Sequence, residues 1–434
     1  MSIALKAALI LFASFLVQLG IGVPISISIG TSTIITALTS LPMDIGIFTA
    51  AQKMISGTDS FSLLAVPLFV LSGNIMNNGG IAKRLVNFAK VIGGRLPGAL
   101  AHANILGNML FGSLSGSAVA AAAAIGGTMA PIQEKEGYDP SYSAAVNIAS
   151  SPTGMLIPPS GVLILYSLVA GGVSISALFV AGYIPGIIMG LASMIVAYVY
   201  AKKNNYPVSE KFTFSEGLKV FLDAIPSLML IVIVIGGIVF GAFTATEGAG
   251  IAVVYTLLLS LFYKSLDLKS VKDILIKTAV TTGVIMFLVA ASSAMSWIMA
   301  YTGIPQAISS AIMSISDNPI VILFIMNITL LIVGTFMDLT PAVLIFTPIF
   351  LPIATNLGMH PVHFGIVLVF NLCIGIMTPP VGSVLFVGCS VSNVSIEKVI
   401  KPLLPFFAAL IAALFLVTYV PALSLFLPKL FNLI

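Results

Sequence analysis

The sequence predicts an all-α polytopic membrane protein built from two inverted repeats, and three observations lead to this fold class. Of the 434 residues, 59% are hydrophobic and only 7% are charged, whereas soluble domains have about 25% charged residues. The mean hydropathy is +1.16. The pattern Pro-Pro-x-Gly occurs at 158–161 and again at 379–382, so the chain is a duplication. At about 20 residues per crossing, we expect about eleven spans plus two re-entrant helical hairpins.

The first expected element is an apolar run that begins after Lys6 and ends near Gly20. No small-residue cleavage site follows it, and Pro24 opens another apolar stretch. We therefore interpret the run as a retained span and not as a signal sequence. Residues 1–59 are predicted to form N-terminal scaffold spans, and residues 60–200 the first repeat.

Lysine-rich connections set the expected orientation. Two such connections are separated by two apolar runs, so both lie on the same side of the membrane. Because cytoplasmic loops carry an excess of lysine, that side is predicted to be the inside. Residues 201–277 then form a linker with scaffold spans, residues 278–421 the second repeat, and residues 422–434 a tail. The second repeat starts on the opposite face from the first, so the two are inverted. The lysines are Lys202, Lys203, Lys211 and Lys219 in the first connection and Lys264, Lys269, Lys272 and Lys277 in the second.

The first repeat contains an apolar segment, 97–131, that is interrupted at its centre by Gly112-Ser113-Leu114-Ser115-Gly116-Ser117. Each arm of about 13 to 15 residues would be roughly 20 Å long as a helix, which is too short for about 30 Å of hydrocarbon. We predict a re-entrant hairpin with its polar tip at mid-membrane. The alanine-rich second arm would allow close helix packing.

A predicted broken helix follows at 144–172, with its break from Ser150 through Pro158-Pro159. Proline removes a backbone donor and leaves carbonyl groups that hydrocarbon cannot solvate. The second half repeats the order, with a hairpin at 320–352 and a broken helix at 363–392. Its tip is predicted at 334–341 and its break at 375–380. Paired broken segments in two inverted halves are typical of secondary transporters.

Each tip facing its own break would create a pocket of hydroxyl groups and free carbonyl groups. Such neutral oxygen ligands suit a hard monovalent cation, and sodium is the expected one. Helices that begin after the breaks, at Ser160 and Val381, would direct partial positive charge at an anion. The alternative is that the serines bond to nearby carbonyls and the glycines only permit packing.

Few ionisable residues lie in apolar context. An acid at membrane depth marks a functional site, and Asp338 on the second tip is the best candidate, although it could instead be a helix cap in an aqueous cavity. Glu247 either faces the pathway or caps the helix that begins there. The only two arginines, Arg84 and Arg95, precede the first hairpin. We therefore expect an anionic substrate to be held mostly by amides, hydroxyls and helix dipoles.

Six motifs follow one another along the chain, at 112–119, 157–160, 181–186, 245–247, 334–338 and 378–382. In this order they resemble the large membrane subunit of tripartite ATP-independent periplasmic (TRAP) transporters over essentially the whole chain. The resemblance implies an inverted-repeat, elevator-type fold of the ion transporter superfamily in the lipid bilayer of the bacterial inner membrane. It also implies sodium (Na+) coupling, a separate small four-helix membrane subunit, and a periplasmic substrate-binding protein that delivers an organic acid.

The resemblance also implies site residues. One sodium site would use Ser113 and Ser115 with carbonyl groups near Gly154, Ile157 and Pro158. The other would use Gly334 and Thr335 with Gly375 and Thr378. The substrate would lie near Ser115, Ser117, Ser160 and Asp338.

Two details qualify the family pattern. Many relatives have an aspartate shortly after the first tip, whereas Ala120 to Ala124 are all alanine here. Residues 71–76, with 80–84 and 99–102, look closer to sialic-acid members than to C4-dicarboxylate members. N-acetylneuraminate (sialic acid) is therefore the expected substrate, and a C4-dicarboxylate is the alternative.

Other classes fit less well. A channel would assemble rings of identical subunits, and a hydrolase would have only Ser115 and His102 to offer as nucleophile and base, so no enzyme activity is expected. The chain lacks the G-x-x-x-x-G-K-[ST] loop of ATPases. The net charge of +4 reflects lysine-rich loops and not a nucleic-acid partner. A stand-alone sodium/dicarboxylate symporter of the same superfamily remains open.

Overall fold

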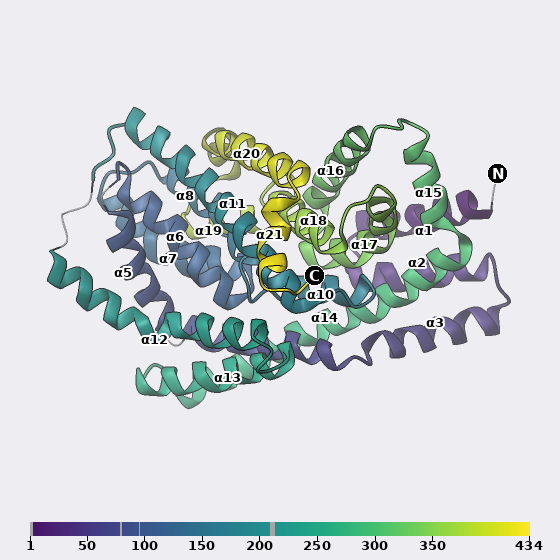
Figure 1. The fold of residues 1–434 in the computed structure, drawn as a ribbon, viewed down its shortest axis with the longest axis horizontal. Helices are drawn as coiled ribbons and strands as arrows, with labels where there is room; N and C mark the ends of the chain where they lie inside the picture. Colours follow the sequence, from purple (N-terminus) through teal and green to yellow (C-terminus); the bar gives the residue numbers. More distant parts are fainter. Residues whose placement is uncertain (1–2, 79, 95, 209–212) are drawn as a thin grey trace.

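A computed structural model describes residues 3–78, 80–94, 96–208 and 213–434, and every regular element in these ranges is a helix (Figure 1). Eight of the described helices are long and apolar enough to cross a membrane, or up to ten if each of two bent pairs counts as one span. Other apolar segments are shorter helices of 10–17 residues. The chain is therefore an all-α polytopic membrane protein in which several crossings are divided by breaks.

The two halves of the chain contain similar series of helices. The first half comprises α1 (Ile3–Gly20), α2 (Ile25–Leu38), α3 (Met43–Thr58), η1 (Phe61–Leu64), α4 (Ala65–Asn78), α5 (Ile81–Gly93), α6 (Ala99–Ser115), α7 (Ala118–Lys135), α8 (Pro140–Ser150), α9 (Thr153–Leu156), α10 (Gly161–Val169) and α11 (Ile175–Lys203). The second half comprises α12 (Phe214–Val239), α13 (Ala245–Phe262), α14 (Leu268–Thr302), α15 (Ile304–Met313), α16 (Pro319–Phe336), α17 (Leu339–Asn356), α18 (Pro361–Gly375), α19 (Ser383–Val391), α20 (Ile396–Tyr419) and α21 (Ala422–Leu430).

The packing of the helices repeats with the sequence. Helices α6, α7, α8, α10 and α11 correspond to α16, α17, α18, α19 and α20. Helix α7 packs on α19 while its counterpart α17 packs on α10, and α8 packs on α20 while α18 packs on α11. The two halves are therefore interlocked, and each hairpin contacts the broken helix of the other half as well as its own.

One contact marks where the halves meet. The thiol of Cys373 donates to the carbonyl oxygen of Pro152 at 3.5 Å, and these residues are 221 positions apart. Equivalent residues of two copies can touch only near the axis that relates the copies. The two broken helices therefore cross at this axis, in the middle of the molecule.

The correspondence extends beyond the repeat boundaries expected at 60–200 and 278–421. Helix α2 packs on α14, and its counterpart α13 packs on α4. Helix α1 packs on α2 and α15, as α12 packs on α13 and α5. By element order and packing, the duplication therefore includes α1 and α2 in the first half and α12 and α13 in the second.

Both hairpins are longer than the proline positions indicate. Helix α7 continues past Pro131, and α17 contains Pro348 and Pro352 in its interior. A proline costs one intrahelical bond, and packing against the other helices can offset that cost. The arms α6 and α7 have 17 and 18 residues, or about 26 and 27 Å. They are thus longer than the roughly 20 Å expected.

The breaks have similar geometry in both halves. The Pro158–Pro159 and Pro379–Pro380 peptide bonds are both cis. Ser160 is the residue before α10, as expected. The second helix begins at Ser383 and not at Val381, because the Val381 N–H donates to the Thr335 carbonyl oxygen at 3.3 Å and so belongs to the break.

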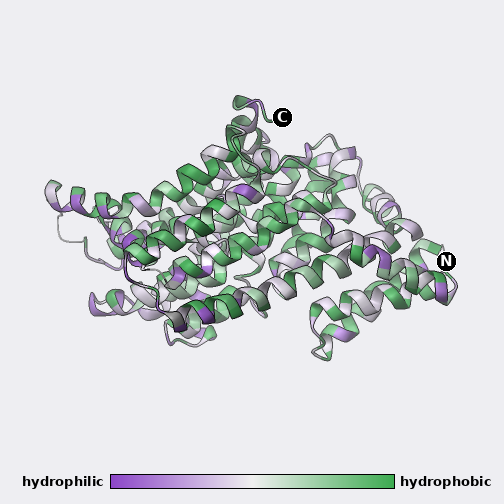
Figure 2. Cartoon of the chain, turned by 90° about the horizontal axis from the view of Figure 1, so that it is seen from below, coloured by the Kyte–Doolittle hydropathy of each residue, from purple (hydrophilic) through white to green (hydrophobic). Residues whose placement is uncertain are grey.

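Polar residues gather at helix ends and connections, whereas hydrophobic residues dominate along the long helices (Figure 2). Lys202 and Lys203 end α11, and Lys264 and Lys269 lie between α13 and the first turn of α14. The two candidate spans α12 and α13 separate these groups, which places them at the same face. Lys211 lies outside the described residues.

Candidate functional site

The first hairpin tip touches the first break through two glycines. A Cβ added at Gly112 would lie 2.9 Å from the Cα of Gly154, and one added at Gly154 would lie 2.2 Å from the carbonyl carbon of Gly112. Only a residue without a side chain permits such an approach of two backbones. This crossing brings Ser113 and Ser115 beside the break that contains Ile157 and Pro158.

The second hairpin tip meets the second break in the same way. A Cβ added at Gly334 would lie 2.9 Å from the Cα of Gly375, and one added at Gly375 would lie 2.5 Å from the Cα of Gly334. Thr335 adjoins this crossing on the tip, and its carbonyl oxygen accepts the bond from Val381 in the break. Thr378 lies on the break, where its hydroxyl donates to the Ile374 carbonyl at 2.7 Å.

The first crossing offers neutral oxygen atoms. The Ser113 hydroxyl donates to the Leu110 carbonyl at 2.9 Å, which leaves its lone pairs free. The carbonyl oxygens of Ile157 and Pro158 accept no backbone hydrogen bond within the described part of the chain. Among the described residues, no three or more His, Cys, Asp or Glu side chains are grouped so that they could hold a metal ion. The first crossing thus presents hydroxyl and carbonyl oxygens, and the binding of a cation there stays a prediction.

Buried asparagines support both crossings, and the sequence analysis did not single them out. The Asn108 amide donates to Asn147 Oδ1 at 3.0 Å and to Ser150 Oγ at 2.8 Å. In the second half, the Asn371 amide donates to Asn327 Oδ1 at 2.8 Å. Each bond joins the first arm of a hairpin to the first arm of its broken helix. Amide side chains inside otherwise apolar helices are the sequence signal that marks these positions.

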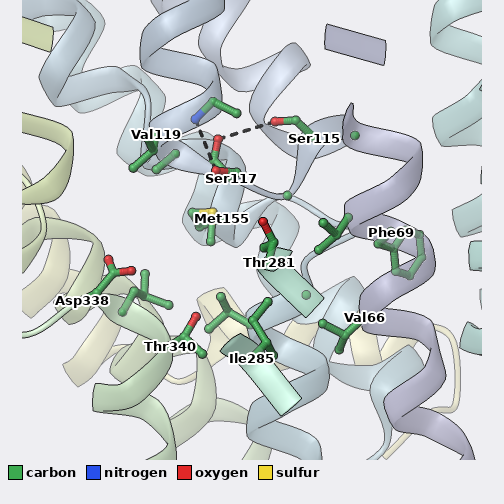
Figure 3. A pocket seen from close by; sticks show the side chains of 18 of the residues that line it. Val66, Phe69, Ser115, Ser117, Val119, Met155, Thr281, Ile285, Asp338 and Thr340 are labelled. Atoms are coloured by element: carbon green, nitrogen blue, oxygen red, sulfur yellow. Dashed lines mark hydrogen bonds between the residues drawn. The ribbon is translucent and has the colours of Figure 1, made fainter. Parts of the chain in front are cut away.

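A cavity of about 440 Å³ lies between the two tips (Figure 3). Ser115 and Ser117 line it from the first tip, and Asp338 lines it from the second. Ser160 does not line it; this side chain is fully buried and its hydroxyl has no partner among the described residues. The structure thus brings together three of the four residues expected at the substrate.

The cavity also has residues that the sequence analysis missed. Thr340 on the second tip and Ser383 beside it add hydroxyl groups, and the Ser383 hydroxyl donates to Asp338 Oδ1 at 3.2 Å. Helices α4 and α14 form the opposite wall. That wall is largely apolar and comprises Val66, Phe69, Val70, Gly73, Asn74, Val280, Thr281, Val284, Ile285 and Leu288.

Other ionisable side chains are used elsewhere. Glu247 completes a capping box with Thr244 at the start of α13, which is the capping role considered for it. Arg84 pairs with Asp223 at 3.1 Å and stacks on the Tyr263 ring at 3.5 Å, away from the cavity. Arg95 lies outside the described residues.

The duplicated helical fold has a tip and a break in each half and one cavity between the tips. These features place the chain in the class of polytopic membrane transporters. Residues 12–423 match the family described as "Tripartite ATP-independent periplasmic transporter, DctM component". The chain therefore belongs to this family of multi-pass bacterial inner-membrane permeases.

Three curated relatives cover nearly the whole chain. YgiK of Salmonella typhimurium, described as uncharacterized, is 56% identical over 98% of this chain and 97% of its own length. The sialic acid TRAP transporter large permease SiaM of Vibrio cholerae is 39% identical over 93% of this chain and 95% of its own. The C4-dicarboxylate TRAP transporter large permease DctM of Rhodobacter capsulatus is 36% identical over 98% and 100%.

A solved structure shares the fold. The YdaH transporter of Alcanivorax borkumensis, described as having an unusual topology, matches with a TM-score of 0.62 at 14% identity. The match covers 88% of this chain and 89% of that one. The two chains thus share one fold over most of their length.

Proposed function

We propose that this chain imports an organic acid across the inner membrane by coupling its movement to sodium, with N-acetylneuraminate as the favoured substrate. The observation that carries the proposal is the pair of equivalent crossings, Gly112 with Gly154 and Gly334 with Gly375, which flank one cavity. Each crossing combines hydroxyl and carbonyl oxygens at a broken helix, which is the arrangement that transporters use for sodium.

Coupling follows from the position of the ion sites beside the tips. A cation at the first crossing would fix the loop that carries Ser115 and Ser117, and one at the second would fix the loop that carries Asp338. Once the loops are ordered, the substrate loses less conformational freedom on binding. Ion and substrate therefore cooperate without direct contact.

The transport step is proposed to be an elevator motion. The hairpins and broken helices interlock across the axis of the duplication, so they would move as one body. Helices α4 and α14 supply the opposite cavity wall and would belong to the scaffold. Gly73 on α4 marks the contact between the two bodies, since a Cβ there would lie 2.7 Å from the Ser115 carbonyl oxygen.

The proposed partners are a small four-helix membrane subunit and a periplasmic substrate-binding protein. Family membership supports both, and the Vibrio cholerae relative supports sialic acid. A C4-dicarboxylate is the second candidate, because the Rhodobacter capsulatus permease is similar over its whole length.

Uptake into proteoliposomes that contain this chain and its small subunit tests the proposal. Radiolabelled N-acetylneuraminate and succinate are supplied with or without the binding protein, and with an inward sodium gradient imposed or collapsed. We expect N-acetylneuraminate uptake that requires both the binding protein and the gradient. Uptake of succinate but not of N-acetylneuraminate would identify a C4-dicarboxylate as the substrate. Uptake that does not depend on the binding protein would contradict a tripartite system.

A further inference from the structure

The first hairpin and its broken helix enclose a column of buried polar side chains. Helices α6, α7 and α8 pack on one another (Figure 1), and six amide and hydroxyl side chains lie along their shared interface. None of the six is more than 2% exposed. This polar column comprises Asn104 and Asn108 on α6, Gln133 on α7, and Ser143, Asn147 and Ser150 on α8.

Hydrogen bonds continue the column toward the open end of the hairpin. Besides its bonds to the broken helix, the Asn108 amide donates to Asn104 Oδ1 at 3.0 Å, one turn further from the tip. A turn beyond that, the Leu100 carbonyl oxygen accepts from the Gln133 amide at 3.2 Å. The Tyr138 hydroxyl accepts from the Leu100 N–H at 3.4 Å. Tyr138 therefore lies at this end of the column.

The column runs from the first crossing toward the cytoplasm. Ser150 ends α8, and a Cβ added at Gly112 would lie 3.5 Å from the carbonyl oxygen of the next residue, Ser151. At the other end, the Tyr142 ring near the start of α8 stacks on Tyr200, near the lysine-bearing end of α11, at a centroid distance of 4.1 Å. Cytoplasmic loops carry an excess of lysine, so this end is expected to face the cytoplasm.

Four polar atoms in the column have no hydrogen-bond partner among the described residues. They are Asn104 Nδ2, Asn108 Oδ1, Gln133 Oε1 and Ser143 Oγ. A buried polar atom without a partner is costly, and internal water that makes about three hydrogen bonds typically satisfies such atoms. Three of the four are oxygens, which are also the ligands that hard cations prefer. The column thus offers sites for water and for a passing cation.

The equivalent interface of the second half is apolar. The crossing glycines and the residues before α7 and α17 align the two copies. Of the six column positions, only Ser150 has a polar counterpart, Asn371. The fold therefore does not require polar side chains at this interface. The other five counterparts, each at most 3% exposed, are Met326, Leu330, Ala354, Phe364 and Leu368.

The second half buries polar side chains at a different interface and bonds them to one another. The Asn371 amide donates to Asn327 Oδ1 at 2.8 Å, and the Asn327 amide donates to Thr418 Oγ1 at 3.2 Å. These bonds join α16, α18 and α20. Among the described residues, one atom of these three side chains, Asn371 Oδ1, lacks a partner. The second hairpin thus has no counterpart of the polar column among its described residues.

We propose that the polar column holds ordered water and forms the route by which sodium leaves the first crossing for the cytoplasm, an inference that rests on the proposed sodium coupling. Amide and hydroxyl oxygens, together with water, replace part of the hydration shell of the ion along the route. The second hairpin opens on the other face, because three candidate spans, α12, α13 and α14, separate it from the end of α11. Its apolar interface blocks the return of sodium to the outside.

Silver ions test whether the column is hydrated. Silver is a monovalent cation that reacts with thiols, and Ser143→Cys places a thiol in the column. Ala354→Cys is the matched control, because Ala354 is the fully buried counterpart of Gln133 in the second hairpin. Both substitutions are made together with Cys373→Ala and Cys389→Ala, which remove the two native cysteines.

Silver is added to inverted vesicles in chloride-free buffer, and maleimide labelling of the denatured protein counts the thiols that remain. We expect the Ser143→Cys variant to react at least tenfold faster than the Ala354→Cys variant. Equal rates for the two variants would show that the column holds no water that connects it to the cytoplasm, which overturns the inference.

A second substitution tests whether sodium uses the route. Asn104→Met introduces the residue type found at the equivalent position of the second half. It should lower the maximal rate of sodium-driven uptake into proteoliposomes at least tenfold, while the sodium affinity, measured by thermal stabilisation of the purified complex, changes less than twofold. A barrier on a route alters the rate and not the equilibrium. Asn104→Ser keeps a hydroxyl and leaves room for water, so it should retain the rate within about twofold.

The outcomes separate this inference from the proposed function. An Asn104→Met variant with the wild-type rate overturns the route, as does one whose sodium affinity falls as much as its rate, because Asn104 would then support the ion site. Loss of the rate in Asn104→Ser as well would also overturn it. The proposed function fails separately if wild-type protein imports no organic acid on a sodium gradient, whereas the silver reaction requires neither substrate nor gradient.

Discussion

At the scale of single residues, glycine decides how closely tip and break approach. Gly112 and Gly154 in the first half, and Gly334 and Gly375 in the second, have no room for a Cβ because each faces backbone atoms. Backbone cannot rotate away as a flexible side chain can. The oxygen atoms proposed to hold sodium are therefore positioned by residues that contribute no side chain.

We predict that Gly154→Ala and Gly375→Ala each weaken the apparent sodium affinity at least about tenfold, which corresponds to about 1.4 kcal/mol. The added methyl group would separate the tip from the break and pull the oxygens apart. The measurement is the sodium concentration that gives half-maximal uptake. Gly127→Ala is the control, since its Cβ would meet only a Val391 methyl group at 3.9 Å. Unchanged sodium dependence in both glycine variants would argue against ion sites at the crossings.

At the scale of elements, buried amide bonds join each hairpin to its broken helix. Asn108, Asn147 and Asn371 are all at most 1% exposed, and Asn327 is 2% exposed. A buried polar group that loses its partner costs about 1–3 kcal/mol. These bonds therefore favour one relative position of the two elements, which keeps the tip beside the break.

We predict that Asn108→Ala and Asn371→Ala each destabilise the purified complex. The free energy of unfolding should fall by about 1–3 kcal/mol, and the unfolding midpoint should fall with it. The Asn147 and Asn327 side chains would lose their buried donors. Thermal unfolding followed by intrinsic fluorescence measures the change. Asn356→Ala, at an exposed helix end, should have little effect. Equal midpoints for all three variants would show that the amide bonds do not hold the elements together.

The residues at which the hairpin arms end depend on packing against other helices. The tips near 112–117 and 334–341 and both breaks could be placed from sequence, because glycine, serine and proline interrupt apolar runs there. The ends of the hairpin arms could not be placed from sequence. Pro131, Pro348 and Pro352 look like helix ends in sequence but lie inside α7 and α17. Contacts with other helices, which no local pattern encodes, carry these helices past their prolines.

At the scale of the whole molecule, the two hairpins open toward opposite faces. The open end of the first adjoins the end of α11, where a Cβ on Gly98 would lie 2.4 Å from the Ala201 Cβ. Three candidate spans, α12, α13 and α14, separate that end from the second hairpin. An odd number of crossings changes the face. The cavity thus lies between one hairpin from each side.

We predict opposite accessibility for cysteines introduced at the two faces. Asn204→Cys, beside the first hairpin's open end, should react with an impermeant maleimide only from the cytoplasmic side. Asn356→Cys, at the second hairpin's open end, should react only from the periplasmic side. Both positions are exposed, whereas native Cys373 and Cys389 are buried. Labelling of whole cells and of inverted vesicles distinguishes the sides, and labelling of both positions from one side would refute the inverted arrangement.

We further predict that Gly73→Ala slows transport at least about tenfold, equivalent to about 1.4 kcal/mol in the barrier. The added Cβ would press on the Ser115 carbonyl oxygen, across the contact between scaffold and moving body. Uptake rates at saturating substrate and sodium measure the effect. Gly283→Ala on α14 has open space around its Cβ and serves as control. A rate equal to wild type would contradict relative movement at this contact.

The sequence by itself determined the membrane class, the duplication, both tips and both breaks, because composition and backbone chemistry are local properties. It also named Ser115, Ser117 and Asp338, which line one cavity. The ion sites remain predictions. The tertiary structure alone decided that the halves interlock at Cys373 and Pro152, that Ser160 is excluded from the cavity, and that α4 and α14 supply an apolar wall. These features depend on contacts between residues far apart in the chain, which no local pattern of residues records.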